Sequence, residues 1–199
     1  MPLPVAHVVV GACMAEALLP SDAPRRNRTI LLLACLTVAP DLDFIPVWLL
    51  DFERGAWHRG FTHSVAFAAL AGCLLAIAFG HRRIRMAIVC ALVLMSHGML
   101  DALTTVGGGG VELLWPFSSA RLRADLFELW EPALGSSAAT PFVMQLLRAS
   151  AVELVTFVPP GLIVILGLRR LRAIPWLRSG QSQPLPVTIL RSSGQRQPP

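Results

Sequence analysis

Five long apolar segments alternate with short polar stretches along most of the chain. A helix that spans a bilayer needs about 20 mostly apolar residues, and the last three segments reach or approach that length. The first segment is shorter, and the second contains two prolines and two aspartates, which predicts a helix with a bent or re-entrant end. The pattern therefore predicts an all-α fold, a polytopic membrane helix bundle with about four to five transmembrane segments. The five segments are 3–19, 29–50, 61–80, 85–105 and 150–168.

Composition favours one membrane domain over a soluble one. Of the 199 residues, 54% are hydrophobic and 15% are charged, and the mean hydropathy is +0.61. The net charge of +5 would also suit a nucleic-acid-binding protein. Most arginines, however, lie in short clusters beside apolar segments, which is typical of topology-setting loops, so we expect no nucleic acid partner. We expect a membrane-embedded domain at 1–172 and a disordered tail at 173–199, rich in Gln, Ser, Pro and Arg.

The arginine clusters predict the orientation of the helices. One cluster follows each of the first, third and fifth segments, so all three lie on one side if every segment crosses the membrane. The positive-inside rule makes that side cytoplasmic. The long region 106–149 then lies outside, and within it the leucines of 118–130 recur at helical spacing, which predicts an interfacial amphipathic helix. The clusters are Arg25/Arg26/Arg28, Arg82/Arg83/Arg85 and Arg169/Arg170/Arg172/Arg178.

Seven ionisable side chains lie in or beside the apolar segments, all toward the predicted outer face. Ionisable groups are costly in lipid, so they face a partner or a cavity and usually mark function. Imidazole and carboxylate groups together form a ligand set for divalent metal ions. With a rise of about 1.5 Å per residue, the two in the fourth segment lie roughly 12 Å and 6 Å below its outer end. The seven residues are His7, Asp41, Asp43, His58, His63, His97 and Asp101.

His97 and Asp101 form the clearest pair. Their i, i+4 spacing places both on one face of a helix, in a segment that carries no other acidic or basic residue after Arg85. A metal-binding or catalytic role is favoured for such a pair inside a membrane segment. The structural alternative is a buried hydrogen bond that holds helices together.

Asp41 and Asp43 follow Pro40 and precede Pro46. On a regular helix, two carboxylates two residues apart would point in different directions. The prolines predict an irregular backbone at this point, which would let both carboxylates turn inward. Such carboxylates suit hard or borderline divalent cations. The alternative for Asp43 alone is that it caps the next helical turn.

His58 and His63 flank a short polar motif before the third apolar segment. Thr62 is expected to cap the following helix, which would place His63 in its first turn. Arg59 would bind an anion or stabilise charge on a phosphate. Surface exposure is the alternative for His58.

The other two histidines are distinguished by their side of the membrane. His7 lies near the outer end of the first segment, where a simple interfacial position is the alternative to a role in the site. His81 lies beside the second arginine cluster on the opposite side, so we expect a loop residue. No cysteine lies near the outer group, which argues against a thiol nucleophile.

The order of these motifs resembles the YdjM-like family of bacterial inner-membrane proteins, which are described as membrane-bound metal-dependent hydrolases. The similarity covers roughly residues 5–118, and its most specific part is HRGFTHS followed by SHGMLD. The resemblance implies a location in the inner membrane and implies that the same seven His and Asp residues are the candidate metal ligands. The motifs are His7, Pro40–Asp43, His58–Ser64, Ser96–Asp101 and Trp115–Ser118.

We therefore expect a membrane-bound hydrolase whose site faces the periplasm or exterior. A metal-activated water would attack an ester or phosphoester, and a lipid-derived substrate suits the location. The histidine count favours zinc, whereas manganese or magnesium is favoured if several carboxylates bind. His58, Asp101 and Arg59 are the candidate catalytic residues, with His58 and Asp101 either ligands or helpers in proton transfer and orientation. The alternatives are a transporter or metal-handling protein that uses the same residues, and a structural membrane protein.

Overall fold

The computed structural model describes residues 4–50, 57–78, 84–104, 110–124 and 141–174. Within these residues every regular element is a helix, and the only strand-like pairing is one isolated antiparallel bridge between Val111 and Leu122. The predicted all-α class is confirmed. The elements are α1 (Pro4–Leu18), α2 (Arg26–Leu36), η1 (Ala39–Asp43), α3 (Phe44–Leu49), η2 (Phe61–His63), α5 (Val65–Ala78), α6 (Ile84–Thr104) and α8 (Phe142–Ala173), where η denotes a 3-10 helix.

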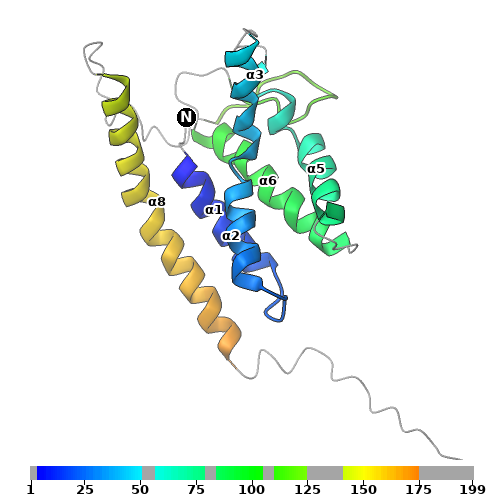
Figure 1. Ribbon diagram of the computed structural model, residues 1–199, viewed down its shortest axis with the longest axis vertical. Coiled ribbons are helices and arrows are strands. Elements are labelled where there is room, and N and C mark those ends of the chain that lie inside the picture. Colours follow the sequence, from blue (N-terminus) through cyan, green and yellow to red (C-terminus); the bar gives the residue numbers. More distant parts are fainter. Residues whose placement is uncertain (1–3, 51–56, 79–83, 105–109, 125–140, 175–199) are drawn as a thin grey trace, which may run out of the picture.

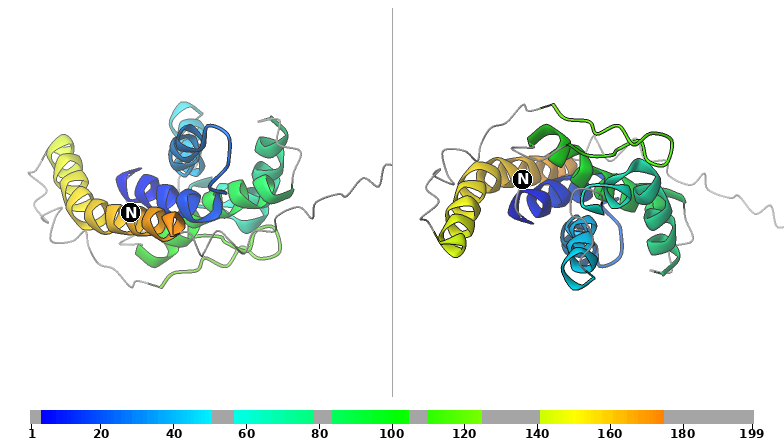
Figure 2. Two further views of the ribbon diagram at one scale, coloured as in Figure 1. Left: turned by 90° about the horizontal axis from the view of Figure 1, so that it is seen from below. Right: turned by 90° about the horizontal axis from the view of Figure 1, so that it is seen from above.

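Helix α1 occupies the centre of the bundle. It packs against α8, α2 and α6, while α5 packs along the other side of α6 (Figure 1). Seen from above and below, α2 and α3 lie on one face of the α1–α6 pair, and the segment 110–124 runs over the opposite face (Figure 2). This arrangement puts α1, η1, η2 and α6 around one point.

Two helices are long and apolar enough to cross a membrane, over Ile84–Leu103 and Val143–Ala173. A third candidate span consists of Arg26–Leu36 and Ala39–Val47, which meet at an angle of 41°. Helices α1 and α5 are apolar but have only 15 and 14 residues. Length and composition thus support two or three spans, and the predicted four to five are not confirmed.

The bend of the second apolar segment agrees with its sequence. Pro40 occupies the first turn of η1, where a missing backbone N–H costs no helical hydrogen bond. The fifth segment behaves differently, because α8 continues through Pro159 and Pro160 and begins at Phe142, eight residues before the predicted start. The third segment is shorter than predicted, because its first residues form η2 and α5 begins only at Val65.

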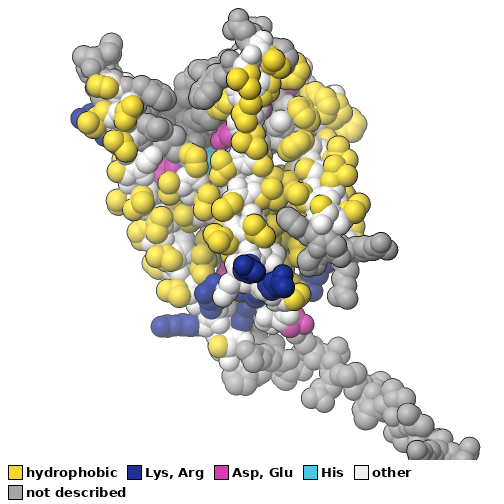
Figure 3. Space-filling view, viewed as in Figure 1, with side chains coloured by type: hydrophobic (Ala, Val, Ile, Leu, Met, Phe, Trp, Pro, Cys, Tyr) yellow, Lys and Arg dark blue, Asp and Glu magenta, His cyan; other side chains and the backbone are white. Residues whose placement is uncertain are grey.

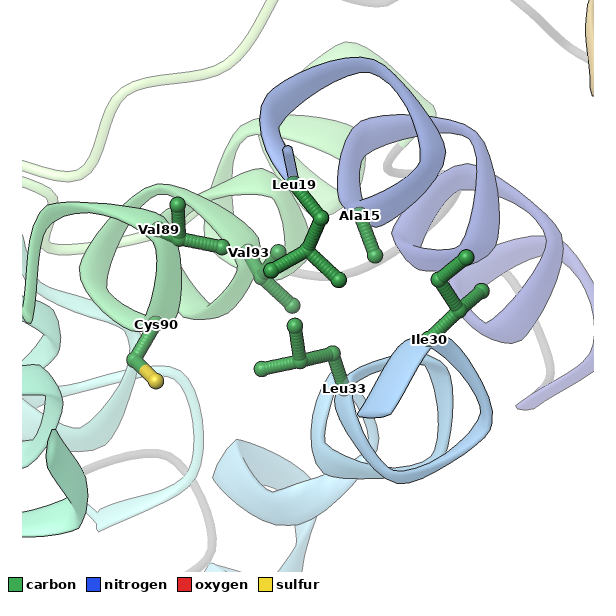
Figure 4. Packing of buried hydrophobic residues seen from close by; sticks show 7 residues of the cluster. All are labelled: Ala15, Leu19, Ile30, Leu33, Val89, Cys90 and Val93. Atoms are coloured by element: carbon green, nitrogen blue, oxygen red, sulfur yellow. The ribbon is translucent and has the colours of Figure 1, made fainter. Parts of the chain in front are cut away.

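The apolar core joins α1, α2 and α6 (Figure 4). Helices in the bundle also approach one another at glycines, as is common in membranes, where small residues let backbones pack closely. A Cβ atom at Gly72 of α5 would collide with the backbone of Ala87 and Ala91 in α6, and one at Gly161 of α8 would collide with Val9 of α1. The core cluster is Ala15, Leu19, Ile30, Leu33, Val89, Cys90 and Val93.

The predicted interfacial helix at 118–130 is not found in its described part. Residues 118–124 are not helical, because Leu122 pairs with Val111, and the Ala124 N–H donates to the Ala102 carbonyl at 2.9 Å. Residues 125–130 lie outside the described residues, as do His81 and Gly107–Gly109.

Candidate metal centre

The structure brings all seven sequence-predicted His and Asp residues into one buried group. They come from separate elements: His7 from α1, the two aspartates from η1, His63 from η2, and the remaining pair from α6, with His58 in the turn before η2. Arg59 lies among them with 4% of its surface exposed. The group has little contact with solvent, since the least buried of the seven, Asp41, has a side chain that is 14% exposed.

Four of these residues form a compact set of ligand atoms, which we call the tetrad: Asp41, His63, His97 and Asp101. Their ligand atoms all lie within 4.8 Å of one another. The two Nε2 atoms of His63 and His97 are 3.1 Å apart. Asp41 Oδ1 lies 3.5 Å and 3.3 Å from these nitrogens, and Asp101 Oδ2 lies 3.6 Å and 4.0 Å from them.

These separations fit the edges of a coordination polyhedron. Ligand bonds of about 2.0–2.1 Å in a tetrahedral zinc site put neighbouring ligand atoms about 3.3 Å apart. The imidazole rings of His63 and His97 are buried, and the neutral imidazole is the form that ligates a metal. The donor set and its geometry therefore suit a divalent cation.

The net charge of the group also favours a divalent cation. The group contains three carboxylates and one guanidinium, which leaves a surplus of two negative charges when the imidazoles are neutral. Uncompensated charge is costly in a buried position. A single divalent ion would balance this surplus.

Asp43 makes contacts that differ from those of the tetrad. Its Oδ1 lies 2.9 Å from His58 Nδ1, and its Oδ2 accepts hydrogen bonds from the Thr62 hydroxyl at 2.8 Å and from the Arg59 N–H at 3.3 Å. Asp43 occupies the N-cap position of α3, yet its side chain makes no capping bond there. The helix-cap alternative for Asp43 is therefore wrong. Asp43 also lies close enough to Asp41 and His58 for the three to form a second candidate set of metal ligands.

Thr62 and His63 also differ from the sequence-based expectation. Thr62 was predicted to cap the following helix, but its hydroxyl bonds to Asp43 instead. Ser64 caps α5, because its Oγ accepts the Phe67 N–H at 3.0 Å. His63 consequently lies in η2, before α5, rather than in its first turn.

His58 is buried, so surface exposure does not describe it. Its ring packs on Phe44 with centroids 3.8 Å apart. With Nδ1 held by Asp43, the other ring nitrogen, Nε2, is buried and has no hydrogen-bond partner among the described residues. An unpartnered ring nitrogen next to a candidate metal site is available to ligate an ion or to exchange a proton.

His7 borders the tetrad through two of its members, Asp101 and His97. Its Nε2 lies 3.4 Å from Asp101 Oδ1, and its ring stacks on His97 with centroids 3.8 Å apart. The Thr37 hydroxyl donates to the His7 carbonyl at 2.9 Å and so ties α1 to the residues just before η1. The interfacial alternative is wrong for His7, which is 1% exposed.

Arg59 is held in an unusual backbone conformation. Its φ of 65° lies in the left-handed region that residues other than glycine rarely adopt. The backbone is fixed on both sides, because the Arg59 N–H donates to Asp43 and its carbonyl accepts the Glu112 N–H at 3.0 Å. Its Nε lies 3.4 Å from Asp101 Oδ2. Strain of this kind is concentrated at functional sites.

A surface pocket lies beside Arg59. It has a volume of about 360 Å³ and is lined by two tryptophans, a phenylalanine, a glycine and a glutamate. Tryptophan is common at the membrane–water interface. The lining residues are Trp57, Gly60, Phe61, Glu112 and Trp115.

Sequence reasoning missed one buried acid close to the site. Glu153 of α8 is fully buried, and its Oε2 accepts the N–H of Ala6, the residue before His7, at 3.2 Å. The signal was present, because Glu153 is an acidic residue within an apolar segment.

Comparisons with known proteins agree with the apolar, membrane-type helices of the chain. The family model described as YdjM inner membrane protein matches residues 1–173. The chain is 33% identical over 183 residues to the inner membrane protein YbcI of Escherichia coli (strain K12), a match that covers 83% of this chain and 95% of that protein. No solved structure gives a significant match.

Proposed function

The chain belongs to the YdjM inner membrane protein family, and from this premise we propose that its buried His/Asp group binds a divalent metal ion and hydrolyses an ester or phosphoester. The observation that carries the proposal is the tetrad, in which two imidazole nitrogens and two carboxylate oxygens from three elements lie within 4.8 Å of one another. Polar contacts that only hold helices together do not require such convergence.

The tetrad offers equal numbers of imidazole and carboxylate ligands. This set suits zinc, and manganese or magnesium would be favoured if Asp43 also ligates the ion. Within the tetrad, Asp101 would ligate through Oδ2, because its Oδ1 faces His7 at 3.4 Å. When bound, such an ion polarises a substrate oxygen and lowers the pKa of a water molecule.

His58 is the candidate general base. Asp43 Oδ1 accepts a hydrogen bond from Nδ1–H, which fixes the tautomer and leaves the lone pair of Nε2 available. A carboxylate that orients an imidazole in this way also stabilises the positive charge that the ring gains when it takes up a proton. Asp43 therefore contributes by positioning His58 and Thr62.

Arg59 is the candidate anion-binding residue. Its guanidinium is buried beside Asp101, and guanidinium groups match the geometry of phosphate oxygens. The neighbouring aromatic pocket would accept the apolar part of a substrate. A phosphoester with an apolar portion, such as one derived from a membrane lipid, fits both features.

The depth of the site supports a membrane-derived substrate. His7 lies nine residues from Glu16 on α1, and His97 lies twelve residues from Arg85 on α6. These spacings place the site about 14–18 Å from the arginine end of the bundle, within a hydrocarbon core about 30 Å thick. With the arginine end in the cytoplasm, the site would lie near the middle of the inner membrane and open toward its periplasmic face.

One observation favours a second candidate, a transporter or metal-handling protein. The aspartates lie on η1, at the 41° bend of the candidate span formed by α2, η1 and α3. Broken helices at ion sites are typical of transporters. Both candidates share the metal site and differ in whether a substrate is turned over.

The test uses the protein purified in detergent. Its metal content is measured, and phosphodiesters and phosphomonoesters are assayed with and without a chelator. We expect about one tightly bound divalent ion per chain and hydrolysis that the chelator abolishes and that zinc or manganese restores. His97→Ala should lose the metal, and Asp43→Asn should lose most of the activity. Asp22→Asn, which changes an exposed carboxylate near the arginine end, is the matched control.

Two results would overturn the proposal. A metal-free protein, or a His97→Ala variant with unchanged metal content, would exclude the tetrad as the metal site. Metal flux into liposomes without any turnover would replace the hydrolase with the transporter. For orientation, a reporter fused after Gly110 should be active in the periplasm.

A further inference from the structure

A second buried charge cluster lies at the end of the bundle opposite the tetrad. Glu16 of α1 is fully buried and is surrounded by three guanidiniums from α2 and α8, which together we call the arginine clasp. Arg26 reaches Glu16 Oε1 at 2.6 Å, and Arg172 reaches the same oxygen at 3.1 Å. Arg169 contacts Oε2 at 3.2 Å.

The arginines of the clasp are held by the backbone as well. Arg26 donates to the Pro20 and Glu16 carbonyls at 3.1 Å and 2.9 Å. Arg172 donates to the Ala17 carbonyl at 2.8 Å. Guanidiniums that are already positioned lose little freedom when they bind a further anion, which favours binding.

The clasp carries more positive charge than its acid can balance. One carboxylate faces three guanidiniums, and the side chains of Arg169 and Arg172 remain 48% and 26% exposed. Arg25, Arg28 and Arg170 are exposed next to them in the chain. Figure 3 shows most of the basic side chains on the visible face gathered at the lower end of the bundle, below the apolar faces of the helices.

The surroundings of the clasp select one class of anion. Leucines adjoining it along α2 and α8 are exposed, with Leu31 at 63%, Leu166 at 56% and Leu171 at 53%. A basic cluster that borders lipid-facing helices on one side of a membrane protein matches the phosphate and the acyl chains of an anionic phospholipid. A soluble polyanion would meet the guanidiniums but leave these leucines uncovered.

We propose that the arginine clasp binds the phosphate of an anionic phospholipid headgroup in the leaflet on the arginine side of the membrane. The lipid would compensate the surplus charge and would bridge α2 and α8 beside α1. This site is independent of the metal centre, because none of its residues contacts the tetrad in the described part of the chain.

The test measures thermal unfolding of the whole protein in detergent, with its metal content held constant. Phosphatidylglycerol is compared with phosphatidylcholine of the same acyl chains, and with inorganic phosphate at the same concentration. At a lipid concentration about a hundred times Kd, phosphatidylglycerol should raise the unfolding temperature by about 5 °C. Phosphatidylcholine and inorganic phosphate should give much smaller shifts.

Arginine variants test which residues are responsible for the stabilisation by phosphatidylglycerol. The double variant Arg25→Gln/Arg170→Gln changes exposed arginines, and Arg169→Gln removes one donor to Glu16. Each should reduce the difference between the two lipids by more than half, and this difference can be measured even if a variant unfolds at a lower temperature. Arg148→Gln, at the other end of α8, is the control.

Three outcomes would overturn the proposal. Equal shifts with both lipids would exclude a specific anionic lipid site. A full shift with inorganic phosphate alone would assign the clasp to a soluble anion. A loss of the lipid difference in Arg148→Gln as large as in Arg169→Gln or in the double variant would move the effect away from the clasp and its neighbouring arginines.

Discussion

The two ends of the bundle both bury charge, but with opposite sign. The metal centre contains three carboxylates and the single guanidinium of Arg59, and the clasp collects three guanidiniums around Glu16. With neutral imidazoles, the first has a surplus of two negative charges and the second a surplus of two positive charges. Because isolated buried charges are costly, each end is suited to a counter-ion of its own, a divalent cation at one end and a phosphate at the other.

The two ends differ in whether the protein itself supplies partners for the buried polar atoms. Both carboxylate oxygens of Glu16 contact guanidiniums. In the metal centre, by contrast, Asp41 Oδ1 and His58 Nε2 are buried without hydrogen-bond partners among the described residues. Buried polar atoms are seldom left without partners in folded proteins. In the clasp the buried acid is thus fully paired with guanidiniums, whereas the His/Asp group keeps buried polar atoms that a divalent ion could contact.

The largest expected effect comes from neutralising a carboxylate of the tetrad. Asp41→Asn keeps the shape of the side chain and removes one ligand charge. Changing a residue that only supports a ligand lowers metal affinity by about 10–100-fold, so loss of a ligand should lower it by more than about 100-fold. Titration with zinc and a competing chelator measures the change.

The same variant tests the charge surplus. In the metal-free protein, Asp41→Asn should leave the unfolding temperature unchanged or raise it, because Asp41 contacts only imidazoles in the group. A clear loss of metal-free stability would mean that Asp41 is a structural contact like Glu16, and the contrast between the two ends would fail.

A smaller effect, independent of metal, is expected at the other end. Glu16→Gln leaves three guanidiniums without a counter-charge. Breaking a fully buried ion pair costs about 3–5 kcal/mol, and the partial exposure of the arginines reduces the expected loss to about 2–3 kcal/mol. The free energy of unfolding in detergent should fall by this amount with and without chelator. A loss seen only in the metal-bound protein would contradict the separation of the two ends.

That the seven polar residues converge could be predicted from the sequence, because the prediction depends only on the geometry of a helix and on the positions of the arginine clusters. The rise of a helix fixes the depth of His97 and Asp101, and the arginine clusters fix which end of each segment is which. The bend at Pro40 was also predictable, because proline acts through local geometry.

Contacts between distant residues were not predictable in this way. Thr62 has the local pattern of a helix cap, but its hydroxyl bonds to Asp43, nineteen residues earlier in the chain. The leucine spacing over 118–130 is typical of a helix, but Leu122 pairs with Val111 instead. Glu153 was missed because its contact with the Ala6 N–H forms only when the N-terminus of α1 lies against α8. In each case a tertiary partner overrides the local preference.

The smallest expected effects concern two glycines that test how tightly the metal centre is packed. A Cβ atom at Gly98, next to His97, would collide with the His63 carbonyl oxygen and would press on Leu113. Gly98→Ala should therefore cost about 1–2 kcal/mol of stability through overpacking, and it should weaken metal binding because it separates α6 from η2. Gly167 of α8 has no atom within 4 Å of such a Cβ, so Gly167→Ala should leave metal affinity unchanged and raise stability by up to about 1 kcal/mol through helix propensity. Equal metal affinities for the two variants would mean that the positions of His63 and His97 do not depend on the close contact between α6 and η2.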